Sequence, residues 1–226
     1  MEEDMGPIKQ ERSIKSQNSF LVKTFLWMFM GLLATGIISY ITYATGTLDV
    51  LAYNGTFSFM LIAELVVVLV LSLLFNKMSP TVASIFFFVY AIINGITLST
   101  IFYSFEISSI VLVFFAAAAI FGICAAIGYF TNKDLSKIGT IALVALLVCV
   151  VVSVINLFLG NSLIDIVIDW IVLILFTGIT AWDMQKVRNY ARYDDGKLHI
   201  NFALELYLDF INIFIRLLSI FGSRRD

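Results

Sequence analysis

The chain of 226 residues has little of what soluble enzymes and secreted domains are built from. Only 13% of its residues are charged, and it has two prolines, two cysteines and one histidine. Cys124 and Cys149 both lie inside apolar sequence, which leaves neither a disulfide framework nor a metal-ligand spacing. We expect both to be small buried side chains. No nucleophile–base arrangement and no phosphate-binding loop is evident, so we expect no enzymatic activity, no cofactor and no nucleic-acid partner.

Hydrophobic residues, in contrast, make up 61% of the chain and aromatic residues 15%. Apolar runs of about 20 residues are typical of membrane-spanning helices. The pattern predicts an all-α integral membrane protein with seven transmembrane helices in the lipid bilayer. We place them at 21–44, 54–75, 80–104, 107–130, 138–160, 163–183 and 201–222. One membrane domain at 21–222 is thus expected between a short flexible tail at 1–20 and a C-terminal tail at 223–226. Ser79-Pro80 fits the start of the third helix, with serine as N-cap and proline in the first turn.

Basic residues indicate the orientation of these helices. Of 14 lysines and arginines, 11 lie in the N-terminal tail or in the second, fourth and sixth connections. The other three, Arg216, Arg224 and Arg225, lie towards the C-terminus. Because positive charge is retained on the cytoplasmic side during insertion, we predict a cytoplasmic N-terminus. With seven spans, the C-terminus is then outside.

Two aspartates stand out in the last two apolar runs. Asp183 closes the sixth run and Asp209 lies inside the seventh, each 13 residues from Gly196 in the polar break. If two antiparallel helices turn there, each carboxylate is about 20 Å from the turn, at ~1.5 Å per residue. The two side chains are therefore expected to meet at a similar depth.

Asp209 also belongs to a polar stripe. Helical spacing places five polar residues on one face of the last run: Asn201, Glu205, Asp209, Asn212 and Arg216. Such a stripe suits a helix that lines a water-filled path or contacts polar groups of other helices. Candidate partners in other runs are Glu64, Asn94, Thr97, Asn156, Thr177 and Thr180, whereas Asp165 and Asp169 are expected at the outer interface.

Two carboxylates in a poorly hydrated place cannot both ionise cheaply, so we expect this pair to share a proton near neutral pH. Protonated, the pair clamps two helices; doubly ionised, it repels and attracts a hard cation. Calcium takes ~6–8 oxygen ligands, and Asp183, Asp209, Glu205 and Asn212 can supply some. The alternative is that Asp183 is fully solvated at the cytoplasmic interface. Lys186 and Arg188 would in either case have to snorkel or join the polar network.

Small residues also recur in the fourth run, at Ala118, Gly122 and Ala126. Their four-residue spacing places them on one helix face, where small side chains let neighbouring backbones approach closely. We expect this face to be an ordinary packing contact.

The segments AWDMQKVR, NGITLS and ALELYLDFINIFIRLL resemble the Bax inhibitor-1 family, whose members carry the transmembrane BAX inhibitor motif. The resemblance covers nearly the whole chain and is closer to small bacterial members, which implies a bacterial cell membrane. It implies a fold in which six helices surround the last one. It further implies a pH-sensitive calcium leak whose sensor is an aspartate pair, matched here by Asp183 and Asp209.

The chain departs from the family pattern at one position. The family has a basic residue in the second span that latches onto the aspartate pair. Here the second run carries Glu64 and no lysine or arginine before Lys77. Arg216 is a candidate latch from the opposite side, about 10 Å along the helix from Asp209.

Three functions remain open from these observations. The first is a calcium leak along the last helix, gated by Asp183 and Asp209, with Glu205, Asn212, Arg216, Glu64 and Asn94 along the ion pathway. The second is a proton-coupled transporter that uses the same carboxylates. The third is a non-transporting regulator of another membrane protein.

Overall fold

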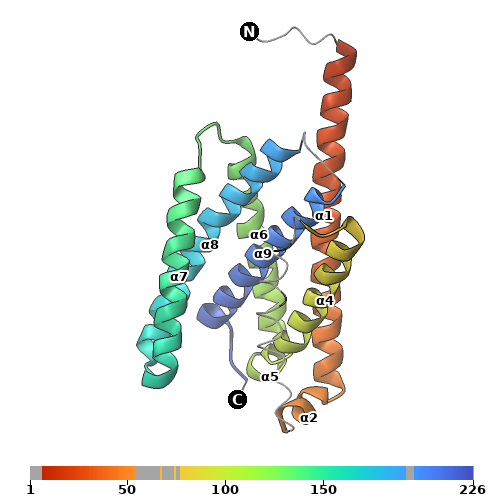
Figure 1. Cartoon of the computed structure of the whole chain (residues 1–226). Coiled ribbons are helices and arrows are strands. Elements are labelled where there is room, and N and C mark those ends of the chain that lie inside the picture. The colour runs from red at the N-terminus through yellow and green to blue at the C-terminus, as the bar shows by residue number, and fades with distance from the viewer. Residues whose placement is uncertain (1–6, 54–66, 68–73, 75–76, 192–195, 226) are drawn as a thin grey trace.

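The computed structural model describes residues 7–53, 67, 74, 77–191 and 196–225. Its helices, shown in Figure 1, are α1 (Pro7–Ala44), α2 (Thr47–Tyr53), α4 (Pro80–Leu98), α5 (Ile101–Ser104), α6 (Ile107–Phe130), α7 (Ser136–Leu159), α8 (Ser162–Tyr190) and α9 (Leu198–Phe221). The predicted all-α class is confirmed. The second apolar run, at 54–75, lies outside the described residues apart from two isolated positions.

Five segments of the described chain are long and apolar enough to cross a membrane: Gln17–Ala44, Pro80–Ser104, Ile107–Phe130, Ser136–Asn156 and Ser162–Tyr190. They match the first, third, fourth, fifth and sixth predicted runs. The last run also forms one helix, α9, which is not among these five segments. The start of α1 and the end of α9 lie at opposite ends of the bundle (Figure 1).

The helix boundaries follow from local sequence. Ser79 caps α4 as predicted, since its Oγ accepts a hydrogen bond from the backbone N–H of Val82 at 3.3 Å. Gly196, in the turn before α9, has a φ of +84°, a conformation that glycine adopts without steric cost. α1 begins at Pro7, ahead of the predicted start at residue 21, so the predicted tail is helical from Pro7 onward.

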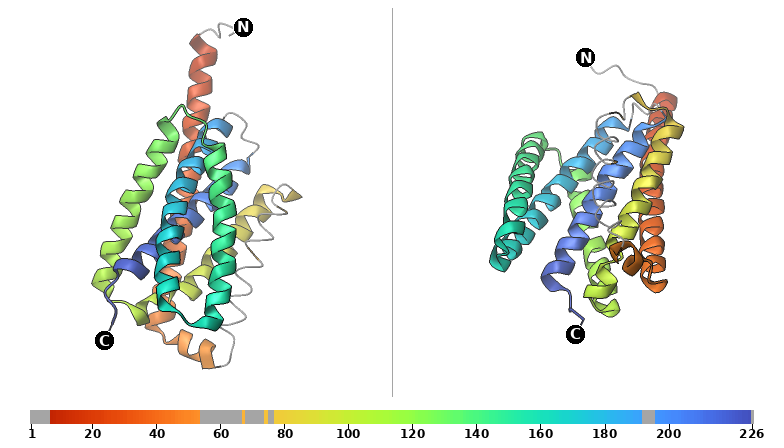
Figure 2. Two further views of the ribbon diagram at one scale, coloured as in Figure 1. Left: turned by 90° about the vertical axis from the view of Figure 1, so that its left-hand side faces the viewer. Right: turned by 60° about the horizontal axis from the view of Figure 1, so that its bottom comes forward.

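Helix α9 packs against α1, α4, α6 and α8 (Figure 1 and Figure 2). Phe202, Leu206, Ile213 and Leu217 are among its many buried apolar side chains. α7 packs against α8 at the edge of the bundle and leaves much of its apolar surface uncovered. This contrast follows from sequence, since α7 is apolar all round and suits lipid, whereas α9 carries polar groups that need partners.

A buried hydrogen-bond network joins α9 to α1 and α4. The hydroxyl of Tyr207, which is fully buried, donates to Asn94 Oδ1 at 2.7 Å. Thr35 Oγ1 lies 2.7 Å from the same hydroxyl and donates to the carbonyl of Ala91 at 2.9 Å. These bonds satisfy polar groups that lipid would leave unpaired.

The prediction for the small residues of α6 is confirmed for Ala118, which is partly buried against the hydrophobic core, but not for the other two. Gly122 and Ala126 are exposed, and a Cβ at Gly122 would meet no atom within 4 Å. Close packing instead uses the neighbouring face at Gly128, where an added Cβ would collide with the backbone carbonyl of Ala181 in α8. Small residues lie on two neighbouring faces of α6, and the four-residue spacing does not show which of them packs against another helix.

The end of the chain is tied to the connection between α5 and α6. The backbone N–H of Ser223 donates to Ser109 Oγ at 2.9 Å, and the N–H of Glu106 donates to the carbonyl of Ser223 at 3.0 Å. The backbone N–H of Arg225 donates to the carbonyl of Ser104 at 3.0 Å. Arg225 also donates from its guanidinium to the hydroxyl of Tyr43 at 2.6 Å.

Candidate functional site

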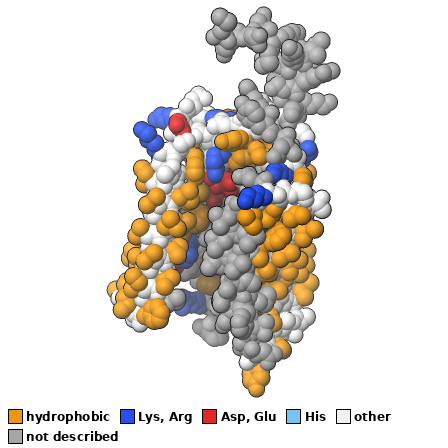
Figure 3. Space-filling model, in the orientation of Figure 1, with side chains coloured by type: hydrophobic (Ala, Val, Ile, Leu, Met, Phe, Trp, Pro, Cys, Tyr) orange, Lys and Arg blue, Asp and Glu red, His pale blue; other side chains and the backbone are white. Residues whose placement is uncertain are grey.

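An ion-paired cluster lies between α8 and α9. The ammonium of Lys186 is 2.8 Å from Asp183 Oδ1 and 2.8 Å from Glu205 Oε2. The contact with Glu205 is a directed hydrogen bond, whereas that with Asp183 is an ion pair without hydrogen-bond geometry. Asn201 donates to the other oxygen of Glu205 at 2.9 Å. In Figure 3, acidic and basic side chains meet on a face that is otherwise largely hydrophobic.

Asp209 is the most deeply buried acid of this group, with 2% of its surface exposed. Its carboxylate interacts electrostatically with Asp183, Glu205 and Lys186. Its Oδ2 has no hydrogen-bond partner among the residues that the structure describes. A buried oxygen without a partner carries its full desolvation cost, which is typical of a site with a functional role rather than of a packing contact.

The structure thus brings Asp183 and Asp209 into one electrostatic environment, as the count from Gly196 predicted. Asp183 is 4% exposed, so the alternative of a fully solvated carboxylate at the interface is wrong. Glu205 joins the pair from the predicted stripe of α9. Lys186 joins this network. The sequence alone allowed it either to do so or to extend to the membrane interface.

The polar residues of the segment AWDMQKVR lie on two different faces of α8. Asp183 and Lys186, three residues apart, share the face of α8 that meets α9. Gln185 and Arg188 share another face, which holds the connection between α6 and α7. Gln185 donates to the carbonyl of Lys133 at 2.8 Å, and Arg188 donates to that of Tyr129 at 2.6 Å. The sequence analysis did not predict that Gln185 and Arg188 anchor this connection, although their three-residue spacing places them on one face of the helix.

Arg216 does not reach the aspartate pair, so its prediction as a latch was wrong. Its guanidinium lies 2.6 Å from Asp169 Oδ1, near the far end of α9. Ser219 donates to the other oxygen of Asp169 at 2.5 Å. Asp169 is buried. Asp165, one turn earlier, is exposed and accepts a hydrogen bond from Asn156 at 2.6 Å.

The other predicted pathway residues lie away from the cluster or outside the described chain. Asn94 belongs to the Tyr207 network between α1, α4 and α9. Asn212 donates to the carbonyl of Leu208 in its own helix at 2.8 Å. Glu64 lies outside the described residues.

The arrangement is not a formed metal site. Within the described ranges, no group of three or more histidine, cysteine, aspartate or glutamate side chains is placed to hold a metal ion. Asp183 and Glu205 instead share the ammonium of Lys186. Calcium binding by Asp183 and Asp209 would therefore require a different arrangement of these side chains.

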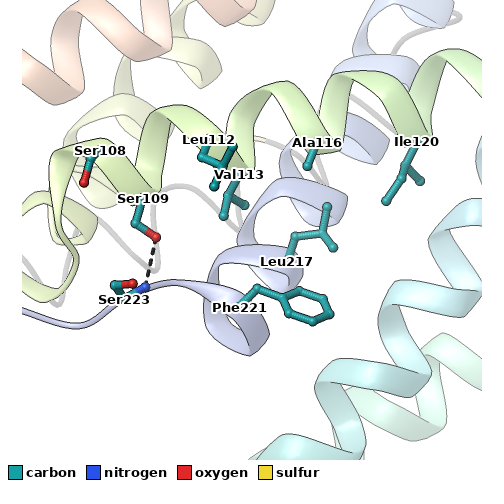
Figure 4. A pocket seen from close by; sticks show the side chains of 9 residues that line it. All are labelled: Ser108, Ser109, Leu112, Val113, Ala116, Ile120, Leu217, Phe221 and Ser223. Atoms are coloured by element: carbon teal, nitrogen blue, oxygen red, sulfur yellow. Dashed lines mark hydrogen bonds between the residues drawn. The ribbon is translucent and has the colours of Figure 1, made fainter.

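A cavity of about 480 Å³ lies elsewhere, between α6 and the end of α9 (Figure 4). Its walls are mostly apolar, and Ser108, Ser109 and Ser223 gather at one end. None of the predicted site residues lines it. We therefore place the candidate site at the buried carboxylates and not at this cavity.

An all-α, multi-pass bundle with carboxylates buried between its last two helices defines a class of membrane protein with an intramembrane ionisable site. The model of the family described as inhibitor of apoptosis-promoting Bax1 matches residues 17–226. The inner membrane protein YbhL of Escherichia coli is 36% identical over 216 residues, 92% of each chain. A protein of Deinococcus radiodurans is 36% identical over 222 residues, 96% of this chain and 95% of its own. A protein of Borreliella burgdorferi is 34% identical over 231 residues, 99% of each chain. The chain belongs to the Bax inhibitor-1 family, as its motifs indicated.

Proposed function

We propose that this protein is a pH-sensitive calcium leak channel in which Asp183 and Asp209 gate cation passage along α9. The observation that carries the proposal is the buried Oδ2 of Asp209, which lacks a hydrogen-bond partner in the described chain and lies in the field of Asp183 and Glu205. Intramembrane carboxylates are costly and mark ion or proton pathways. Their oxygen atoms suit calcium as the transported ion.

The pH response follows from charge. In acid, protons neutralise the carboxylates, and a protonated pair bridges α8 and α9 by a hydrogen bond that closes the path. As pH rises, the second carboxylate ionises, the pair repels, and its oxygens attract a divalent cation. The leak is therefore expected to grow with pH through the titration of the pair.

The proposal includes an arrangement and an orientation. We place α9 at the centre of a seven-helix bundle, with six helices around it. The contacts of α9 with α1, α4, α6 and α8 support this. We place the N-terminus in the cytoplasm and the C-terminus outside, in a bacterial cell membrane. The distribution of basic residues and the bacterial relatives support this.

Calcium flux tests the proposal directly. Purified protein in liposomes with a trapped calcium-sensitive dye should leak calcium at a rate that rises with pH. Asp209→Asn and Asp183→Asn should each change that pH dependence, whereas Asp165→Asn, an exposed site on α8, should not. Unchanged flux and unchanged pH response in both site variants would contradict the proposal.

The same assay separates the two alternatives. A flux that collapses when the proton gradient is dissipated at fixed pH identifies a proton-coupled transporter. No flux from any variant, together with capture of a membrane-protein partner that survives the double aspartate substitution, identifies a regulator.

A further inference from the structure

The ammonium of Lys186 lies between carboxylates of two neighbouring helices. Its ammonium is 2.8 Å from an oxygen of Asp183 on α8 and 2.8 Å from an oxygen of Glu205 on α9. It therefore bridges two acids on different helices. Asp209, with its partnerless Oδ2, lies in the same field.

The charges around this ammonium are not balanced. Among the described residues, one ammonium faces three acids, Asp183, Glu205 and Asp209. Arg188, two residues away, donates to the carbonyls of Tyr129 and Thr131 on another face. An excess of carboxylates around one ammonium attracts a second cation, which then competes with the ammonium for their oxygens.

We propose that Lys186 is a tethered competitor of the permeating cation, so that a divalent ion enters only when it displaces this ammonium from Asp183 and Glu205. The inference rests on the proposed function and adds a positioning residue to it. Lys186 is then the counter-cation of the acids, and it comes from the sixth span, whereas the family pattern has a basic residue in the second span.

The side chain has the properties that such a competitor needs. Lysine carries a compact charge on a flexible four-carbon stem, so it can leave a site without moving its helix. A quarter of its side chain is exposed, which gives it a way out. Its ammonium also lies 4.2 Å from the centre of the Trp182 ring. This cation–π contact is made while the ammonium is paired with both acids, so it places the Trp182 ring beside the same site.

Three variants isolate the role of the charge. Lys186→Gln removes the charge and keeps most of the side-chain length, and Lys186→Arg keeps the charge. Lys137→Gln makes the same charge change at an exposed site on α7 and serves as the matched control. Size-exclusion profiles and unfolding temperatures establish that each variant is folded before it is compared.

Cation binding is measured first in detergent near neutral pH, where terbium ion, the probe, stays in solution. Energy transfer from Trp182 reports binding beside it, and Trp182→Phe identifies that part of the signal. If the ammonium holds the site nine-tenths of the time, its removal should tighten apparent terbium binding about tenfold. Lys186→Arg and Lys137→Gln should bind like the wild type. Equal affinity for Lys186→Gln and the wild type would overturn the inference.

Calcium flux then separates this inference from the proposed function. In liposomes at alkaline pH, Lys186→Gln should leak several-fold faster than the wild type, and Lys186→Arg should not. A pH-dependent leak that Lys186→Gln leaves unchanged contradicts the competitor and leaves the channel standing. Tighter terbium binding without calcium flux in any variant contradicts the channel and leaves the competition for the acids standing. A leak equally fast in Lys186→Arg and Lys186→Gln would attribute the effect to packing, and would also overturn the inference.

Discussion

The ion pair between Asp169 and Arg216 should contribute measurably to the attachment of α9 to α8. Asp169 is 7% exposed and is held by the guanidinium of Arg216 at 2.6 Å and by the hydroxyl of Ser219 at 2.5 Å. Asp169→Asn preserves the shape of the side chain but leaves the guanidinium without its counter-charge. The buried Nε of Arg216 already lacks a hydrogen-bond partner in the described chain, so little else compensates.

The magnitude follows from the burial of the two partners. Removing one member of a fully buried pair costs about 3–5 kcal/mol. The side chain of Arg216 is 32% exposed, and water screens part of this cost, so we expect about 2–3 kcal/mol. For a chain of this length each kcal/mol lowers the unfolding temperature by about 2–4 °C. Asp169→Asn should therefore unfold roughly 5–10 °C below the wild type.

Thermal unfolding in detergent, followed by tryptophan fluorescence, measures the difference. Asp165→Asn is the matched control, because it makes the same change one turn earlier at an exposed position, where the asparagine oxygen can still accept the hydrogen bond from Asn156. It should cost at most about 1 kcal/mol. The double variant with Arg216→Gln should recover part of the loss, with a coupling of about 1–3 kcal/mol. Equal shifts for Asp169→Asn and Asp165→Asn, or strictly additive effects in the double variant, would refute the reasoning.

Three further predictions concern packing and pH. Gly128→Ala should lower the unfolding temperature by the equivalent of about 1–3 kcal/mol or more, because its Cβ would strike the α8 backbone; Gly122→Ala, in open space, should be neutral or slightly stabilising, and similar losses for both would contradict the packing described. Tyr207→Phe should cost about 1–3 kcal/mol, because it removes the hydroxyl that donates to the buried Asn94 Oδ1; an unchanged unfolding temperature would show that this hydrogen bond does not stabilise the fold. Ser136 donates hydrogen bonds from its side chain and its backbone to the exposed carboxyl of Asp134, and these bonds hold the pKa of that carboxyl below its ordinary value. The ionised Asp134 therefore stabilises the fold above its unfolded pKa, and this stabilisation is lost as pH falls through its folded pKa. Asp134→Asn should unfold at a slightly lower temperature than the wild type at neutral pH and at the same temperature in strong acid. A difference in unfolding temperature that persists in acid would contradict this.

Much of the fold and part of the site could be predicted from sequence. Apolar length predicted where the described membrane helices lie, because lipid requires helices of a minimum length. The turn at Gly196 and the two aspartates are close in the chain, so counting residues was enough to bring Asp183 and Asp209 together.

The partners of these residues could not be predicted in the same way. Helical spacing puts residues on a common face, but the neighbour of that face depends on the rotation of each helix about its axis. Arg216 was correctly placed on the stripe of α9, yet its partner Asp169 belongs to α8. The apolar character of α6 is nearly uniform, so its pattern could not distinguish the exposed Gly122 from the buried Gly128.

Lys186 shows a different limit of sequence reasoning. A lysine near the end of a membrane helix can extend to the interface or turn inward, and its spacing from Asp183 allows both. Only the position of Glu205 on the facing helix decides between them. Lys186 could therefore be read from the motif, but its role as the counter-charge of the acids could not.

The hydrogen bonds of Ser223 and Arg225 give α9 an asymmetry between its two ends. Near Phe221 the helix is fastened twice, through the tail to the α5–α6 connection and through Arg216 to Asp169. Near Leu198 it follows a turn at Gly196, and its charged link to α8 is Glu205 with Lys186. We therefore expect that, if the link between Lys186 and Glu205 is broken, the end of α9 near Phe221 keeps its position and any displacement of the helix is larger towards Leu198.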